Sequence, residues 1–261
     1  MSTGSKAEYF RWLPLATVAA LVGLWWLAAV LKVVSPVFLP SPLAVARRLY
    51  GIATEGYVDG TLLQHGLASL GRVAAALAAS IAVAVPAGFA IGLSRVGRGV
   101  LDPIIELLRP IPPLAYLPLI VIWLGIGEVS KVTVIALAMI PPIALSAAAG
   151  VRGVAADRVE AALALGASRA QVIGLVVLPS SLPGILTGIR IGLGAGWTTL
   201  VAAELVAATR GLGFMIKSGA DFLVTDVVIG GILVIAGIAL LMELAMRRLE
   251  ARLTPWAKTF G

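Results

Sequence analysis

The ionisable and nucleophilic residues of this 261-residue sequence exclude most catalytic chemistry. It has no cysteine and one histidine, His65, so disulfides, thiolate chemistry and histidine clusters that bind metals are ruled out. No G-x-x-x-x-G-K-[ST] run occurs, so the chain lacks that type of phosphate-binding loop for ATP hydrolysis. Serine, histidine and acidic residues show no triad-like grouping. We therefore expect no catalytic residue, no metal site and no cofactor in this chain.

Two ionisable residues stand out because they lie within a strongly apolar run, where charge is costly. The guanidinium of Arg190 suits the oxygens of a sulfonate or carboxylate, so it is a candidate for contact with an anionic solute. The alternative for Arg190 is a salt bridge or a side chain extended to the membrane surface. Glu204 is a candidate gate residue or the structural partner of a nearby cation. So few acids within the apolar runs argue against a proton-driven carrier.

A less apolar segment, residues 152–181, predicts two short helices that project from the rest of the chain. Alanine and leucine favour a helix after Ala155, and Asp157 and Glu160 lie near its start, where the helix dipole favours acids. Gly166 is expected to end this helix. A second helix is expected over residues 168–177, ending before Pro179. Such a pair indicates a docking element for another protein, and a solvated linker is the alternative.

The composition requires these segments to sit in a membrane protein. The sequence is 60% hydrophobic and 13% charged, whereas soluble domains are about 45–50% apolar and about 25% charged. A soluble fold could not bury that much apolar surface. The net charge of +7 is expected to reflect the excess of lysine and arginine in cytoplasmic loops, so no nucleic-acid partner is predicted.

Six apolar runs are expected to cross the membrane, since about 20 apolar residues span its core. They cover residues 12–34, 67–93, 110–126, 132–151, 182–206 and 227–246 of one transmembrane domain, residues 1–261. An even number of spans places both termini on one side. Most lysine and arginine residues outside the spans lie on the side of the termini, so we expect the termini and residues 152–181 to be cytoplasmic.

The docking segment carries a specific motif. Glu160-Ala161-Ala162, Gly166 and Leu178-Pro179 resemble the EAA motif of permease subunits of bacterial ABC importers, with Val176 in place of the usual isoleucine. The resemblance implies an all-α, type I importer permease fold whose EAA coupling helix fits a cleft on an ATP-binding subunit. Those six motif residues are then the ATPase-coupling residues.

Further runs resemble the nitrate/sulfonate/taurine/bicarbonate branch of these permeases, and the taurine permeases most. They lie at residues 35–40, 101–107, 109–119, 123–128, 199–205, 207–215 and 253–256. The resemblance implies a homodimer in the bacterial inner membrane, with two ATP-binding subunits that hold ATP and Mg and a periplasmic or lipoprotein solute-binding protein. The expected cargo is a small anionic or zwitterionic solute, taurine foremost, moved by alternating access. Other aliphatic sulfonates, nitrate and bicarbonate remain open, as do an autonomous secondary transporter or channel and a scaffold without transport activity.

The candidate translocation path combines the intramembrane charges with residues that disturb helices. It comprises Arg190, Trp197, Glu204, Pro112 and Pro113. The prolines break the third span, either as an irregular helix start or as a flexible point during alternating access. Glycines at 184, 188, 192 and 196 form a small-residue stripe that permits close helix packing, or else lines the path or a subunit interface.

Overall fold

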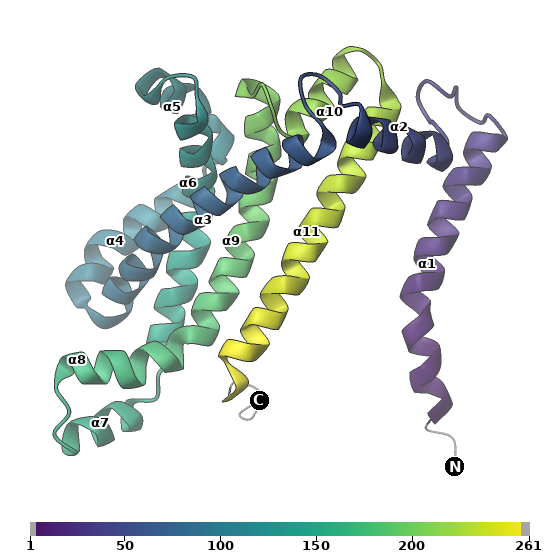
Figure 1. The fold of residues 1–261 in the computed structure, drawn as a ribbon. Helices are drawn as coiled ribbons and strands as arrows, with labels where there is room; N and C mark the ends of the chain where they lie inside the picture. The colour runs from purple at the N-terminus through teal and green to yellow at the C-terminus, as the bar shows by residue number, and fades with distance from the viewer. Residues whose placement is uncertain (1–3, 257–261) are drawn as a thin grey trace. The chain divides into compact units, whose positions relative to one another are not determined.

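The structure, a computed structural model, describes residues 4–256, and every regular element in that range is helical. The helices follow one another as shown in Figure 1. Their bounds are α1 Gly4–Val30, α2 Pro42–Thr54, α3 Leu62–Leu93, α4 Arg95–Leu108, η1 Pro113–Tyr116, α5 Leu117–Leu124, α6 Glu128–Arg152, α7 Ala156–Ala164, α8 Arg169–Val172, η2 Ile173–Val177, α9 Leu178–Ala207, α10 Leu212–Asp221 and α11 Thr225–Leu253. The all-α prediction is confirmed.

Five helical segments of the described range are long and apolar enough to cross a membrane. They are Trp12–Val30, Leu62–Leu93, Glu128–Arg152, Arg169–Val206 and Thr225–Leu253. A sixth candidate is a bent pair, Arg95–Leu108 with Pro113–Leu124, whose parts meet at 93°. Counting the pair as one span gives six, the number expected from the sequence, although that span was expected at residues 110–126 alone.

The span expected at residues 110–126 differs most from a simple membrane helix. α5 has 8 residues, which reach about 12 Å, whereas the hydrocarbon core is about 30 Å thick. Pro112 has an extended backbone with ψ 127° and precedes the 3-10 turn η1, which opens with Pro113. Proline lacks an N–H and disfavours helix in the residue before it. Pro110, Pro112 and Pro113 therefore separate α4 from α5.

The chain forms two compact units, which we describe separately. Unit 1 comprises Met1–His65 and Met215–Val234, and unit 2 comprises Gly66–Phe214 and Ile235–Gly261, each within the described range. In unit 2, α6 and α9 pack along much of their length (Figure 1). The main core of unit 2 includes the fully buried residues Ile91, Ile135, Met139, Ile143 and Leu200.

The glycine stripe of α9 faces α6. A Cβ added at Gly188 would lie 2.6 Å from Cβ of Ser146 and 3.2 Å from the carbonyl oxygen of Ile143. The neighbours of the other three stripe glycines are likewise residues of α6. The stripe thus lets two helices approach closely. This confirms the interpretation of the stripe as packing within one bundle.

The start of α9 corrects the helix end predicted at Pro179. The helix that starts at Arg169 continues through the π-helical turn η2 into α9, and the whole segment runs to Val206. Pro179 lies in the first turn of α9, where a missing N–H is tolerated. In the π-helical turn η2 just before Pro179, wider-spaced hydrogen bonds replace the ordinary α-helical ones. The membrane-spanning helix is therefore continuous with the second helix of the docking segment.

Unit 1 is held together by polar contacts between its loops and helices. The indole Nε1 of Trp25 donates to the carbonyl oxygen of Pro40 at 3.0 Å, and the hydroxyl of Thr225 donates to the carbonyl oxygen of Val37. Arg48 and Asp226 form an ion pair at 3.1 Å. Between Trp12 and Val30, α1 is apolar with none of its most apolar stretch buried. An apolar helix without cover in the described structure is suited to contact with lipid or another chain.

Candidate functional site

The predicted coupling residues Glu160, Ala161 and Ala162 lie on α7, a helix of 9 residues. In unit 2, α7 lies beside α8, next to the end of α6 and the start of the helix that becomes α9 (Figure 1). A helix this short is not stable alone in water, so tertiary contacts must support it. Asp157 in its first turn adds a favourable interaction with the helix dipole.

Those supporting contacts come from one face of α7. Val159 and Ala162 pack against a small buried cluster of Val151, Val172 and Val177, which anchors α7 to the ends of the long helices. The rest of the surface is open.

Glu160 and Ala161 on this open surface are exposed. Leu163 is 48% exposed and Leu165 is 90% exposed. These exposed residues leave α7 free to contact another protein, and its docking role stays a prediction. The exposure of Leu163 places it on the outer surface of α7, away from the valine cluster.

The turn after α7 depends on Gly166, which has a φ of +84°. This left-handed conformation favours glycine and is common where helices end. The N–H of Ala167 donates to the carbonyl oxygen of Ala162 at 3.1 Å, which closes the turn. Ser168 and Gln171 then form a capping box that starts α8. Leu178 and Pro179, the last members of the motif, begin α9.

Pro113 lines a large cavity of unit 2, which has a volume of about 500 Å³. Its walls come from the end of α4, η1, α6 and α9. They are mostly apolar, with one cation, Arg109, and the hydroxyl groups of Tyr116 and Ser146. Pro112 directly precedes η1 and is exposed.

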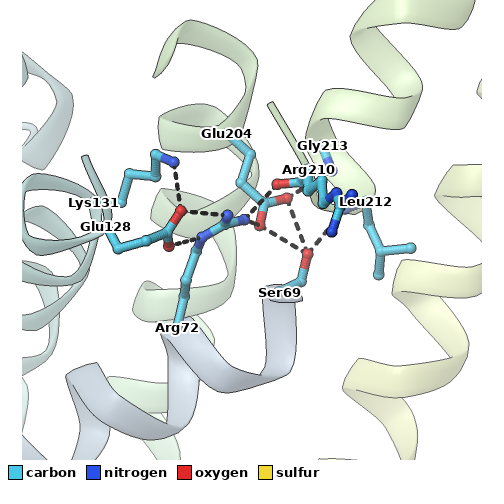
Figure 2. A network of polar contacts seen from close by, with 8 residues as sticks. All are labelled: Ser69, Arg72, Glu128, Lys131, Glu204, Arg210, Leu212 and Gly213. Atoms are coloured by element: carbon cyan, nitrogen blue, oxygen red, sulfur yellow. Dashed lines mark hydrogen bonds and ion pairs between the residues drawn. The ribbon is translucent and has the colours of Figure 1, made fainter. Parts of the chain in front are cut away.

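The side chain of Glu204 is completely buried in a polar network (Figure 2). Its Oε1 accepts from Nη1 of Arg72 at 2.5 Å and from Oγ of Ser69 at 2.8 Å. Its Oε2 accepts from the backbone N–H of Gly213 at 2.8 Å. These partners match the structural role considered for Glu204. Its predicted role in the path stays a prediction.

Arg72 extends this network to the start of α6. Its Nε and Nη2 donate to the two carboxylate oxygens of Glu128 at 2.5 and 2.8 Å, and Nζ of Lys131 donates to Glu128 at 2.8 Å. Nη1 also donates to the carbonyl oxygen of Arg210 at 2.7 Å. One guanidinium therefore joins α3, α6, α9 and the segment that leads into α10 (Figure 2). Figure 2 shows Arg72 between the two carboxylates.

Arg190 and Trp197 line a second cavity of unit 2, of about 290 Å³, between α9 and α11. Nη1 of Arg190 donates to Oε2 of Glu250 at 3.2 Å, so the salt bridge considered from the sequence has a partner. Trp197 is 7% exposed, and its indole N–H has no hydrogen-bond partner within the described part of the chain. The two residues thus share one cavity, separate in lining from that of Pro113. Their predicted role in the path also stays a prediction.

Sequence reasoning did not identify Ser69, Arg72, Glu128, Lys131 or Glu250 as partners. Arg72 carried a usable signal, because a cation inside an apolar run requires a counter-ion. The identity of that counter-ion could not be found, since Glu204 is 132 positions away along the chain. Glu250 is similarly 60 positions from Arg190.

This bundle of membrane-length helices with a projecting α7 has the fold of an importer permease, and the comparisons define the class. Residues 73–255 match the family of the binding-protein-dependent transport system inner membrane component. The chain belongs to this family and is the permease subunit of a binding-protein-dependent ABC importer. The family implies ATPase subunits and a solute-binding protein as partners.

Individual relatives show which members of the family this chain is similar to. The chain is 58% identical over 260 residues to the taurine transport system permease protein TauC of Escherichia coli strain K12, covering 97% of this chain and 94% of the relative. It is 34% identical to a putative aliphatic sulfonates transport permease protein of Bacillus subtilis strain 168, over 93% of this chain and 86% of the relative. Identity to the nitrate import permease protein of Synechocystis is 32%, over 83% of this chain and 81% of the relative.

The solved structures agree on the fold. An inward-facing conformation of the MetNI methionine ABC transporter aligns with a TM-score of 0.65 at 21% identity, covering 74% of this chain and 96% of that one. An amino acid ABC transporter aligns with a TM-score of 0.59, covering 82% of this chain and 97% of that one. These confirm the predicted type I importer permease fold.

Proposed function

We propose that this permease subunit imports taurine. The observation that carries this proposal is the 58% identity to the taurine permease of E. coli over 97% of the chain. Identity to the aliphatic sulfonate permeases is 32–34% and to the nitrate permease 32%. Taurine carries an ammonium and a sulfonate, so a zwitterionic solute is the cargo. Other sulfonates, nitrate and bicarbonate are the alternatives.

Uptake in cells tests the choice of cargo. A strain that lacks its own taurine permease but retains the taurine ATPase and binding protein would express this chain, and uptake of labelled taurine would be measured beside ethanesulfonate and nitrate. We expect taurine uptake to be restored and to be reduced by excess unlabelled taurine. The matched control is the same strain with an aliphatic sulfonate permease. Uptake of ethanesulfonate or nitrate without taurine uptake would contradict the proposal.

The working unit is proposed to contain two copies of this chain, two ATP-binding subunits that hold ATP and Mg, and an external solute-binding protein that is periplasmic or a lipoprotein. The large cavity of unit 2 supports the pairing, since its lining includes exposed residues, Ile111 and Ile191 among them. The path lies at this cavity, next to Pro112 and Pro113. Alternating access then moves η1 and α5, which are already separated from α4 by a 93° bend.

Coupling is proposed to run through α7. The exposed carboxylate of Glu160 meets a basic residue of the ATPase, Ala161 permits close approach, and Leu163 and Leu165 fill its cleft. Ala162 and Gly166 keep α7 in place against the rest of unit 2, and Leu178 and Pro179 connect it to α9. ATP-driven closure of the ATPases would shift α7 and, through the continuous helix from Arg169, the spanning part of α9.

Substitution of Glu160 tests the coupling. Glu160→Lys reverses an exposed charge on α7 without disturbing the buried valine cluster. We expect co-purification of the ATPase to fall at least tenfold, with membrane insertion unchanged. Glu106→Lys, which reverses an exposed charge on α4, is the matched control. Unchanged co-purification and uptake in Glu160→Lys would rule out the docking assignment.

The orientation is proposed to place α7 and both termini on the cytoplasmic side of the bacterial inner membrane. Two contacts support the placement of the end of α11 on that side. Arg190 pairs with Glu250 near the end of α11, and Trp197, further along α9, shares a cavity with Ala239, earlier in α11. The two helices are therefore antiparallel, and α11 ends toward the side on which the helix of α9 begins.

A further inference from the structure

The break between α4 and η1 contains a cation without a counter-ion. Arg109 lies midway between Arg95 and Leu124, the two ends of the bent pair that forms the sixth candidate span. Its side chain is exposed and forms no hydrogen bond or ion pair within the described part of the chain. A guanidinium in the middle of a span is costly unless an anion or water accompanies it. Arg190, by contrast, is already paired with Glu250.

Arg109 lines the large cavity of unit 2, whose volume is about 500 Å³. Other walls of this cavity come from the middle of long helices, at Pro142 of α6 and at Ile191 and Ala195 of α9. Among the described residues that line it, none is an aspartate or a glutamate. The cavity is therefore positively charged, and no acid in its walls competes for Arg109.

Two hydroxyl groups complete the polar part of the lining. The hydroxyl of Ser146 has no hydrogen-bond partner within the described chain and, unlike the indole N–H of Trp197, is not fully buried. The hydroxyl of Tyr116 donates to the carbonyl oxygen of Leu108 at 3.3 Å or to that of Ile111 at 3.4 Å. These two carbonyl groups lie on either side of Arg109 in the chain, so Tyr116 stabilises the break that holds the cation.

We propose that Arg109 binds the sulfonate of the solute as it passes through this cavity, with the hydroxyl of Ser146 as a second donor. The inference rests on the proposed import of a taurine-like solute through this cavity. The planar fork of a guanidinium matches two oxygens of an oxyanion. The rest of the lining is mostly apolar and suits a short carbon chain. Because Arg109 is exposed, the contact is weak enough to release the solute.

Occupancy of the cavity can be measured with a single thiol, since the sequence contains no cysteine. Ala149 is exposed, lines the cavity and lies three residues from Ser146 on α6. In the transporter purified with its ATPase, we expect high-millimolar taurine or ethanesulfonate to slow modification of Ala149→Cys by a neutral maleimide at least threefold. Ethanolamine, a cation of similar size, should not slow it. Added Arg109→Gln should abolish this protection, whereas added Arg98→Gln, at an exposed position outside the cavity, should preserve it.

Transport by the reconstituted complex provides a second measurement. Arg109→Gln should lower taurine uptake about tenfold, because it removes a charge-assisted hydrogen bond to the solute. Arg109→Lys keeps the charge without the fork and should retain at least three times the uptake of Arg109→Gln. Co-purification of the ATPase and the melting temperature should not change, since the substitution breaks no ion pair of the described chain. Arg98→Gln is again the matched control.

The two measurements separate this inference from the choice of cargo. Protection by ethanesulfonate alone, together with no taurine uptake by the parent, would contradict taurine as cargo and leave the sulfonate site at Arg109 in place. Normal taurine uptake by Arg109→Gln, or protection that survives in that background, would overturn the site and leave the cargo proposal in place. No protection by either sulfonate, or equal protection by ethanolamine, would also overturn the site, and this comparison needs no substitution at Arg109.

Discussion

Glu204 shows how far a single intramembrane charge can be interpreted from sequence. Its position in an apolar run indicated that it must have a partner or a function, and the structure gives it Ser69, Arg72 and the N–H of Gly213. The number and geometry of these contacts satisfy the carboxylate. The long sequence separations explain why sequence alone left its role open between gate and structural partner.

Neutralising Glu204 should destabilise unit 2. Glu204→Gln keeps the shape but leaves Arg72, with 6% of its side chain exposed, without one of its two acids. Breaking a buried ion pair costs on the order of 3 kcal/mol. The variant should therefore melt several degrees lower in thermal unfolding of the detergent-purified chain. Glu106→Gln on the exposed surface of α4 is the control and should melt like the parent. A parent-like melting temperature for Glu204→Gln would show that the network contributes little to stability.

Gly166 illustrates the opposite case, where a residue type alone was informative. A glycine after an alanine-rich, acid-started segment predicted the end of a helix, and the observed φ of +84° is one that glycine adopts without strain. At Pro179 the residue type alone was misleading, because it predicted a helix end where the helix continues. Its position in the first turn of α9, after a π-helical turn, depends on backbone geometry that residue preferences do not report.

At the scale of elements, the contact between α6 and α9 sets the framework on which α7 and both cavities are built. The small-residue period on α9 predicted a close approach, but it did not identify α6 as the partner, because any helix could use such a stripe. The break at Pro112 and Pro113 was likewise visible in the sequence. The 93° angle between α4 and the segment of η1 and α5 could not be predicted from the sequence, because packing on α6 determines the direction of α5.

Adding a methyl group to the stripe should separate the two helices. Gly188→Ala places a Cβ 2.6 Å from Cβ of Ser146 and 3.2 Å from the backbone of Ile143, so α6 or α9 must shift. Overpacking of this kind costs about 1–3 kcal/mol, which thermal unfolding in detergent would detect.

Gly194→Ala, on the same helix but with nothing within 4 Å of the added Cβ, is the matched control. It should be neutral or stabilising by up to about 1 kcal/mol, because alanine favours helix over glycine. If both variants lower the melting temperature equally, close packing at Gly188 is not the cause.

At the scale of the whole molecule, apolar composition was sufficient to predict a membrane protein built from long helices. Five of the six expected spans are long helices in the described range, and the sixth requires the bent pair of α4 with η1 and α5 to count as one span. Only 13% of the residues are charged, but those within the apolar runs were informative about contacts, because each buried charge requires a specific partner. What composition could not supply is how copies of the chain assemble. The large cavity of unit 2 contains exposed apolar residues that a second copy is proposed to cover.

Cross-linking tests that pairing, and the sequence is well suited to it because it contains no cysteine. In a two-fold symmetric interface, a residue near the axis meets its own copy. Ile191 is 54% exposed and lines the cavity, so Ile191→Cys should form a covalent dimer with a short bis-maleimide in membranes. Leu241→Cys on α11, where Leu241 is 67% exposed, controls for random collision and should stay mostly monomeric. If the Leu241→Cys variant cross-links as much as the Ile191→Cys variant or more, the interface lies elsewhere, because lipid-facing positions would then be the ones that meet.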